Sequence, residues 1–218
     1  MSPVTEPSHL TITRAAYDAI AVDYAQHFRA EPSNAFGRAM LGAFAELVRG
    51  SGPVADLGCG PGNVTAHLHS LGLDVFGVDL SPKTVENARR LHPDLRFDVG
   101  SMTELALADG ALGGIVAWYS VIHTPQELLP ELFAEFHRLL APGGHVLLAF
   151  QVGDQPLHLA EAWGHRIGLD FRRLSPDHIT ELLEQAGFAV AARLVREPDP
   201  AEAPAEPVPQ AHLLARRS

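Results

Sequence analysis

The stretch Val54-Ala55-Asp56-Leu57-Gly58-Cys59-Gly60-Pro61-Gly62-Asn63-Val64-Thr65 decides how the rest of the chain is interpreted. It opens as a short apolar strand, passes through a turn rich in glycine, and ends at the start of a helix. Glycine adopts backbone torsions that other residues avoid, and without a Cβ it lets a ligand approach the main chain closely. We therefore expect a small-molecule site at this strand-to-helix turn.

A second acidic residue, Asp79, follows the next strand-like run, which begins at Asp74. Two parallel strands that each carry a carboxylate near their end, with a glycine turn between them, are typical of a nucleoside-binding unit. The NAD fingerprint spaces its glycines as G-x-G-x-x-G, whereas here Gly58, Gly60 and Gly62 alternate. Asp56 would also lie near the phosphates of a dinucleotide, so its charge favours a cationic ligand instead.

Composition excludes several classes of function. The chain has 218 residues, of which 46% are hydrophobic and 19% charged, as expected for a single globular domain. A net charge of −10 disfavours a nucleic-acid or membrane partner. The one cysteine excludes an internal disulfide and, with no signal peptide or long apolar run, predicts a cytoplasmic protein. The sequence carries almost no signal of oligomeric state.

Strand-like and helix-like segments alternate after residue 52. Apolar runs predict strands at 53–57, 74–79, 95–99, 114–119 and 145–150, and helices at 62–71, 82–92, 125–140 and 177–185, with a short weak one at 103–108. Near-continuous apolar strands suit an α/β fold with a doubly wound sheet of seven mostly parallel strands. The last two strands, 190–195 and 211–216, flank a proline-rich segment and predict an antiparallel C-terminal hairpin. Ser81-Pro82 and Thr124-Pro125, the second with the glutamate of a capping box at Glu127, predict two helix starts.

The segments outside this alternation predict a cover over the sheet. Residues 1–13 read as a loose arm, residues 14–50 as N-terminal cover helices (14–28 and 36–48), and residues 151–174 as a lid insertion with a weak helical pattern at 156–167. In the first helix, Tyr17, Ile20, Tyr24 and Phe28 share one face. That face either packs into the core or covers the ligand with its tyrosine hydroxyls inward.

At these motifs the sequence resembles the class I S-adenosylmethionine-dependent methyltransferases. The resemblance rests on Asp56–Gly62, on Val78-Asp79-Leu80-Ser81, on Leu140-Ala141-Pro142-Gly143-Gly144 and on Glu184-Gln185-Ala186-Gly187-Phe188, and it extends over roughly residues 14–217. It implies S-adenosyl-L-methionine as the cofactor and a methyl transfer as the reaction. It also implies a Rossmann-like fold. The histidines, including His67 and His69, lack a carboxylate or cysteine partner at ligand spacing, so we expect no bound metal.

The resemblance assigns cofactor contacts residue by residue. Asp79 and the adjacent Leu80 would hold the ribose, and Gly58, Cys59, Gly60 and Gly62 would line the methionine part, with Asp56 at its ammonium group. Where related enzymes often carry an aspartate for the adenine amino group, Ser101 and Met102 stand here. Tyr24, Trp118 and Tyr119 would wall the pocket. The structural alternatives are a helix cap for Asp79, a buried turn-former for Asp56 and core packing for Trp118 and Tyr119.

The acceptor side is less constrained by the sequence. His123 lies just before a predicted helix start, where the dipole keeps its ring neutral, and it is the candidate catalytic base; the alternative is a histidine that fastens the loop. Tyr17, His123, Trp163 and Arg172 are candidate substrate contacts, although Arg172 and its neighbour Arg173 also suit a solvated face. The end of the fourth strand lacks the Asn/Asp-Pro-Pro-aromatic motif that resembling enzymes acting on planar amide or amino nitrogens, including those of DNA, commonly carry.

The sequence thus predicts a methyltransferase that acts on an O, N or C atom of a small-molecule acceptor. Two alternatives stay open: a catalytically silent module that binds S-adenosylmethionine, and an NAD-linked oxidoreductase, which the glycine spacing and Asp56 disfavour.

Overall fold

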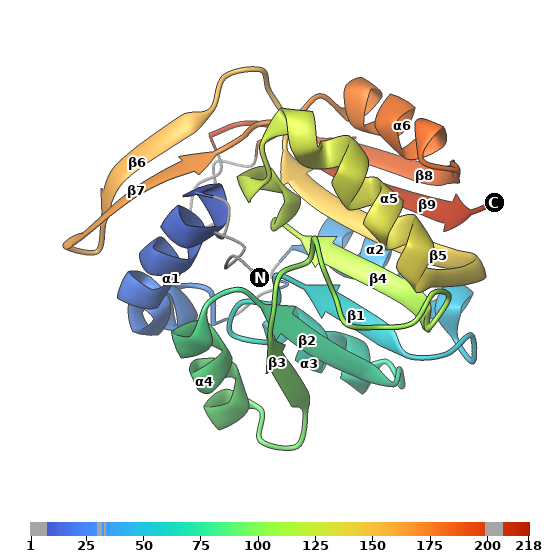
Figure 1. Ribbon diagram of the computed structural model, residues 1–218, viewed down its shortest axis with the longest axis horizontal. Coiled ribbons are helices and arrows are strands. Elements are labelled where there is room, and N and C mark those ends of the chain that lie inside the picture. Colours follow the sequence, from blue (N-terminus) through green and yellow to red (C-terminus); the bar gives the residue numbers. More distant parts are fainter. Residues whose placement is uncertain (1–7, 30–31, 33, 199–206) are drawn as a thin grey trace, which may run out of the picture.

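The computed structural model describes residues 8–29, 32, 34–198 and 207–218. Its centre is a seven-stranded sheet in the order β3-β2-β1-β4-β5-β9-β8 (Figure 1). The strands are β1 (Val54–Leu57), β2 (Val75–Asp79), β3 (Arg96–Val99), β4 (Leu112–Trp118), β5 (Leu140–Gln151), β8 (Phe188–Arg196) and β9 (Gln210–Arg217). Strands β1 to β5 run parallel, and β9 is antiparallel to both β5 and β8. The predicted mostly parallel sheet with an antiparallel C-terminal hairpin is confirmed.

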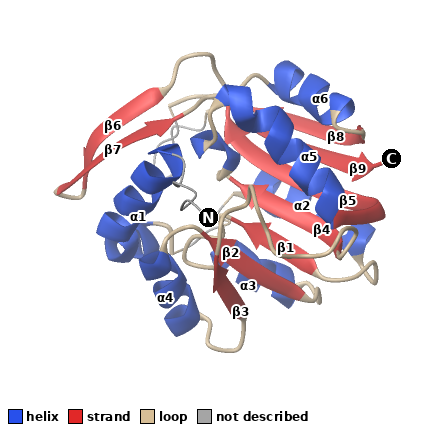
Figure 2. Cartoon of the chain, viewed as in Figure 1, coloured by secondary structure: helices blue, strands red, loops and turns tan. Residues whose placement is uncertain are grey.

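Helices cover both faces of this sheet (Figure 2). On one face, α2 (Ala35–Val48) and α3 (Asn63–Ser70) bury Phe44 and Leu68 against the central strands. On the other face, α5 (Leu129–Leu139) and α6 (Pro176–Gln185) bury Phe133, Phe136 and Ile179. Every residue of β4 is buried. A central parallel strand is covered on both faces, which explains the unbroken apolar run of β4.

The helix α4 (Pro82–Leu91) begins as the sequence predicts, since the Ser81 side chain accepts a hydrogen bond from the Thr84 amide at 3.1 Å. The helix start predicted at Thr124 is wrong. Two single 3₁₀ turns, Val121–His123 and Gln126–Leu128, precede α5, which starts only at Leu129 with Pro130 in its first turn. No side-chain cap forms at Thr124 or Pro125, so the predicted capping box is absent.

The weak helix expected at 103–108 is also not formed. The Leu105 amide donates to the carboxylate of Glu135, and the guanidinium of Arg138 donates to the carbonyls of Leu105 and Leu107. Side chains of α5 therefore satisfy the backbone groups that a helix would have paired internally.

The N-terminal helix α1 (Ser8–His27) starts earlier than Arg14, so residues 8–13 are helical and not part of a loose arm; residues 1–7 lie outside the described residues. The helix is fastened to the start of α4. Asp18 accepts hydrogen bonds from the Ser81 hydroxyl at 2.6 Å and the Lys83 amide at 3.2 Å, and Arg14 donates to the Leu80 carbonyl.

The region expected to be weakly helical at 156–167 is instead a β-hairpin, β6 (Leu157–Ala162) and β7 (His165–Phe171). The apolar residues Leu159, Ile167, Leu169 and Phe171 pack against Ala16 and Ile20 of α1. A strand places alternate side chains on one face. Packing against α1 therefore favours the two-residue spacing of these apolar residues over the weak helical spacing. Figure 1 shows the hairpin beside α1, at the edge of the sheet that also carries the carboxyl ends of the parallel strands.

The buried histidine His212 makes the folding stability depend on pH. Its side chain is fully buried on β9, and its ring is tilted against that of Trp118 with 5.0 Å between the ring centroids. Within the described part of the chain, neither ring nitrogen has a hydrogen-bond partner. Burial, with a smaller effect of Arg196, lowers its pKa to about 4.

Unfolding frees His212 to take up a proton at its ordinary pKa of about 6.5, so folding stability should fall as the pH decreases from about 6.5 to about 4. We expect His212→Phe to reduce that slope by about 1.4 kcal/mol per pH unit. Urea unfolding at several pH values measures it, and identical slopes for both proteins would contradict the expectation.

Candidate active site

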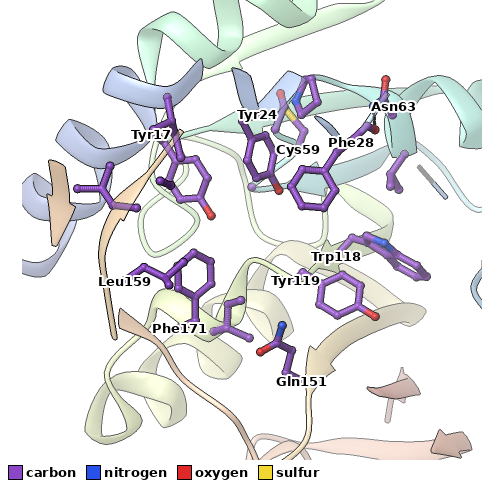
Figure 3. A pocket seen from close by; sticks show the side chains of 18 of the residues that line it. Tyr17, Tyr24, Phe28, Cys59, Asn63, Trp118, Tyr119, Gln151, Leu159 and Phe171 are labelled. Carbon is purple, nitrogen blue, oxygen red and sulfur yellow. Dashed lines mark hydrogen bonds between the residues drawn. The ribbon is translucent and has the colours of Figure 1, made fainter. Parts of the chain in front are cut away.

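Two adjoining cavities lie at the carboxyl ends of β1, β2, β4 and β5, beneath α1 and the β6–β7 hairpin. The larger cavity has a volume of about 290 Å³ and the smaller about 80 Å³. Both are lined by Tyr17, Tyr24, Gly58, Gly60, Trp118 and Tyr119. These shared residues therefore stand where the two cavities meet. Figure 3 shows Tyr17, Tyr24 and Phe28 facing Tyr119 and Phe171 across the larger space.

Asp56 lies at the floor of the larger cavity and is fully buried. One carboxylate oxygen accepts a hydrogen bond from the Thr65 hydroxyl at 2.6 Å, and the other has no partner among the described residues. Burial raises the pKa of this carboxyl to about 7. A buried acceptor without a donor is costly, so the site is suited to a cationic donor such as an ammonium group.

The glycine turn lines both cavities through Gly58 and Gly60. The amides of Gly58 and Cys59 both donate to the Val78 carbonyl, at 2.7 and 3.0 Å, which ties the turn to the end of β2. Gly58 has φ +72°, and a Cβ there would lie 2.3 Å from the Cβ of Ser120. Cys59 is buried, and burial raises its thiol pKa well above the usual range, so the thiol stays protonated.

Asp79 borders the smaller cavity together with Leu80, Ser101 and Met102. Its carboxylate accepts from the amides of Gly60 and Ser81, both at 2.9 Å. Burial raises its pKa, and the two amides partly offset that effect. Since Ser81 itself caps α4, Asp79 is not the helix cap. The Ser101 hydroxyl is 2.7 Å from that of Thr103.

Tyr17 and His123 form a pair. The Tyr17 hydroxyl lies 2.8 Å from Nε2 of His123, whose Nδ1 lies 3.3 Å from the Asp170 carbonyl oxygen. A carbonyl only accepts, so Nδ1 carries the proton, Nε2 is the acceptor and Tyr17 donates to it. Burial lowers the pKa of His123 to about 4, against the raising effect of the Asp170 carbonyl. The ring is thus neutral as the sequence suggested, but its burial, and not a helix dipole, is the main cause.

The candidate substrate contacts do not all line the same cavity. Tyr17 lines both, whereas His123 lines only the smaller one. Trp163 lines the larger cavity from the hairpin tip, with φ +48°, an edge contact to Tyr24 and a tilted contact to His27. Arg172 lines neither cavity, because its guanidinium donates to the His123 carbonyl at 3.1 Å.

Several lining residues were not anticipated from the sequence, among them His9, Asn63, Gln151, Phe171 and Gln210. Gln151 and Gln210 are terminal residues of β5 and β9, one position outside the predicted strands. A polar residue directly after an apolar strand, at the edge where the parallel strands end, was the signal available for Gln151.

In the described ranges, no group of three His, Cys, Asp or Glu side chains is arranged to hold a metal ion. Among the same residues, none of the helices combines the length and apolar character needed to cross a membrane.

Comparison with known proteins agrees with this geometry. Residues 54–144 match the family described as "Methyltransferase domain". A malonyl-[acyl-carrier protein] O-methyltransferase of Pectobacterium atrosepticum is 30% identical over 146 residues, 60% of this chain and 57% of the relative. A trans-aconitate 2-methyltransferase of Variovorax paradoxus is 37% identical over 129 residues, 53% of this chain and 48% of the relative. The chain therefore spans about half the length of these curated relatives.

Among solved structures, the magnesium protoporphyrin IX methyltransferase of Synechocystis, determined with S-adenosylmethionine bound, superposes with a TM-score of 0.71 at 16% identity, covering 98% of this chain and 99% of that one. At that identity the likeness establishes the fold. Residues 54–144 are therefore a methyltransferase domain, and over this range the chain is similar to S-adenosylmethionine-dependent methyltransferases.

Proposed function

We propose that this protein transfers a methyl group from S-adenosylmethionine to an O, N or C atom of a small-molecule acceptor. The observation that carries the proposal is the pair of cavities that meet at Gly58 and Tyr119. The smaller cavity has the carboxylate of Asp79 at its border. The larger one combines apolar walls with the Asp56 oxygen, which has no partner in the part of the chain that the structure describes. The similarity to a malonyl-[acyl-carrier protein] O-methyltransferase and to a trans-aconitate 2-methyltransferase supports a small acceptor.

The residues present fit the cofactor. The free oxygen of Asp56 suits an ammonium group, and the Cβ-free turn at Gly58 and Gly60 leaves room for the amino-acid part against the backbone. Asp79 suits the ribose hydroxyls, with Met102 as an apolar neighbour for adenine. When bound, the cofactor supplies a methyl group activated by a positively charged sulfur.

The chain itself must place the acceptor in line, exclude water and accept a proton. For a hydroxyl acceptor, the oxygen bonds to the methyl carbon as the carbon–sulfur bond breaks, and the hydroxyl proton must leave. Tyr17 stands between the larger cavity and His123. The acceptor proton passes to the Tyr17 oxygen while the proton of Tyr17 moves to Nε2 of His123, which leaves a neutral phenol and an imidazolium.

The pKa values predict separate pH dependences for binding and turnover. Asp56 has a pKa of about 7, so kcat/KM for S-adenosylmethionine should rise with pH through about 7 as the carboxylate forms. His123 has a pKa of about 4 and is already neutral, so kcat at saturating cofactor should stay flat between about pH 5.5 and 7.

Initial rates across this pH range measure both quantities. Asp56→Asn keeps an acceptor for the Thr65 hydroxyl and should remove the rise in kcat/KM. A kcat that falls tenfold per pH unit below about 6.5 would contradict the assignment of a neutral His123.

The proposed function is tested by incubating the protein with S-adenosylmethionine and a panel of phenols, amines and carboxylic acids, with S-adenosylhomocysteine formation as the readout. Acceptor-dependent turnover supports the enzyme. Cofactor binding without turnover on any acceptor would favour the silent binding module. A cytoplasmic location and the absence of nucleic-acid and membrane partners remain predictions from the sequence.

A further inference from the structure

Gln151 and Gln210 face each other across the pairing of β5 and β9, and both line the larger cavity. Gln151 ends β5, at the carboxyl edge of the parallel strands, and Gln210 opens β9. Figure 3 shows the carboxamide of Gln151 directed into the space between Tyr119 and Phe171. Two carboxamides from neighbouring strands thus border the same wall of the cavity.

Each of these glutamines has a carboxamide oxygen that is buried and without a hydrogen-bond partner among the described residues. Gln210 is 1% exposed, and its Nε2 donates to the Val208 carbonyl at 2.8 Å, which fixes the amide so that its oxygen is the unpaired acceptor. A buried acceptor left without a donor is destabilising. Ligand N–H or O–H groups would remove that cost at both positions.

The other residues that line the larger cavity indicate which class of ligand would carry those donors. No lysine, arginine or histidine of the described chain lines the larger cavity, and the acidic side chain that lines it is Asp56. Aromatic and aliphatic side chains make up most of the rest: Tyr17, Ile20, Tyr24, Phe28, Trp118, Tyr119, Ile122, Leu157, Leu159, Trp163, Ile167 and Phe171. Burying a carboxylate here without a cationic side chain is unfavourable, whereas a flat neutral ring gains by leaving water.

We propose that Gln151 and Gln210 select the acceptor, and that the acceptor is a neutral, flat, largely apolar molecule with O–H or N–H donors, such as a hydroxylated aromatic or lactam ring. The inference rests on the proposed function and narrows it. It separates this chain from relatives whose names specify malonyl and aconitate acceptors, which are acids. Arg172, the cationic candidate from the sequence, is turned to the His123 carbonyl and supplies no counter-charge.

Binding to the protein loaded with S-adenosylhomocysteine tests the proposal without requiring turnover. Isothermal titration is carried out with 2-naphthol, with 2-methoxynaphthalene, which lacks the donor, and with 2-naphthoate, which carries a negative charge. We expect 2-naphthol to bind at least about tenfold more tightly than either, as one hydrogen bond of about 1.4 kcal/mol predicts. Equal or tighter binding of 2-naphthoate, or no binding of any probe, overturns the proposal.

The glutamines are tested by Gln151→Met and Gln210→Met, which keep side-chain length and remove the amide. The single hydroxyl of 2-naphthol donates to one glutamine at a time, so at least one of the two variants should bring its affinity to within about threefold of that for 2-methoxynaphthalene, with the affinity for S-adenosylhomocysteine unchanged. Gln185→Met, at an exposed position at the end of α6, is the matched control and should retain the preference.

An unchanged preference in both cavity variants would show that the glutamines do not select the ligand. Failure of S-adenosylhomocysteine itself to bind the unaltered protein would instead overturn the proposed function, and the two failures are therefore distinguishable.

Discussion

Replacing Gly58 with alanine is expected to weaken S-adenosylmethionine binding at least about 100-fold and to lower the free energy of unfolding by about 2–4 kcal/mol. The new Cβ would lie 2.3 Å from the Cβ of Ser120 and 3.0 Å from its hydroxyl oxygen. Ser120 cannot easily give way, because it is buried and its hydroxyl donates to the Leu57 carbonyl at 2.6 Å. The turn must therefore shift away from the end of β4, and the cradle for the cofactor is lost.

Two other glycines separate the causes of this effect. Gly50 has φ +76° with no atom within 4 Å of a built Cβ, so Gly50→Ala carries the backbone strain alone, about 1 kcal/mol. Gly42 lies within α2 in open space with no unusual torsion, so Gly42→Ala should leave stability unchanged or raise it by up to about 1 kcal/mol. Calorimetric binding and urea unfolding of the three variants provide the comparison. Full cofactor affinity in Gly58→Ala would contradict the assignment of this turn to the cofactor.

Replacing His123 with alanine is expected to lower kcat about 10²–10⁴-fold on an acceptor that must lose a proton, with the dissociation constant of S-adenosylmethionine changed by less than about threefold. The variant removes the nitrogen that lies 2.8 Å from the Tyr17 hydroxyl. Tyr17→Phe removes the oxygen between the larger cavity and His123 and should lower kcat by a similar factor. If both act as one unit, the double variant should be no slower than the worse single one.

The matched control is His145→Ala. His145 is a buried histidine whose pKa is likewise lowered by burial, but it lies in the middle of β5 and lines neither cavity. Its loss should reduce stability without changing kcat. Wild-type kcat in His123→Ala would remove this histidine from the mechanism and leave it the role of fastening the loop through Asp170.

The parts of the fold that the sequence predicts well are those whose patterns are local. The run from Val54 to Thr65 contains its own strand, its glycine turn and its helix start, and the side chains of Asp56 and Asp79 follow from the ends of strands that must be parallel. The Ser81 cap is similarly contained within a few residues of sequence. Local patterns of this kind need no knowledge of what packs against them.

The parts that sequence patterns miss depend on contacts between distant segments. The 157–171 hairpin packs its alternate apolar side chains on the face of α1, and Asp18 and Arg14 fasten α1 to the Leu80–Lys83 segment. Residues 105–107 stay outside any helix because Glu135 and Arg138 satisfy their backbone. In the site, the pairing of Gln151 with Gln210 depends on the register of β5 and β9. The Tyr17–His123 contact joins two segments that lie far apart in the sequence.

The central claim is that the turn at Asp56–Gly62 holds a cationic sulfonium cofactor and not a dinucleotide. Isothermal titration of the purified protein with S-adenosylmethionine and, separately, with NAD tests it most directly, with Asp79→Ala as the paired variant. The account predicts one-site binding of S-adenosylmethionine, weakened at least about tenfold by Asp79→Ala, and no heat of binding for NAD. Binding of NAD by a protein that does not bind S-adenosylmethionine would contradict it.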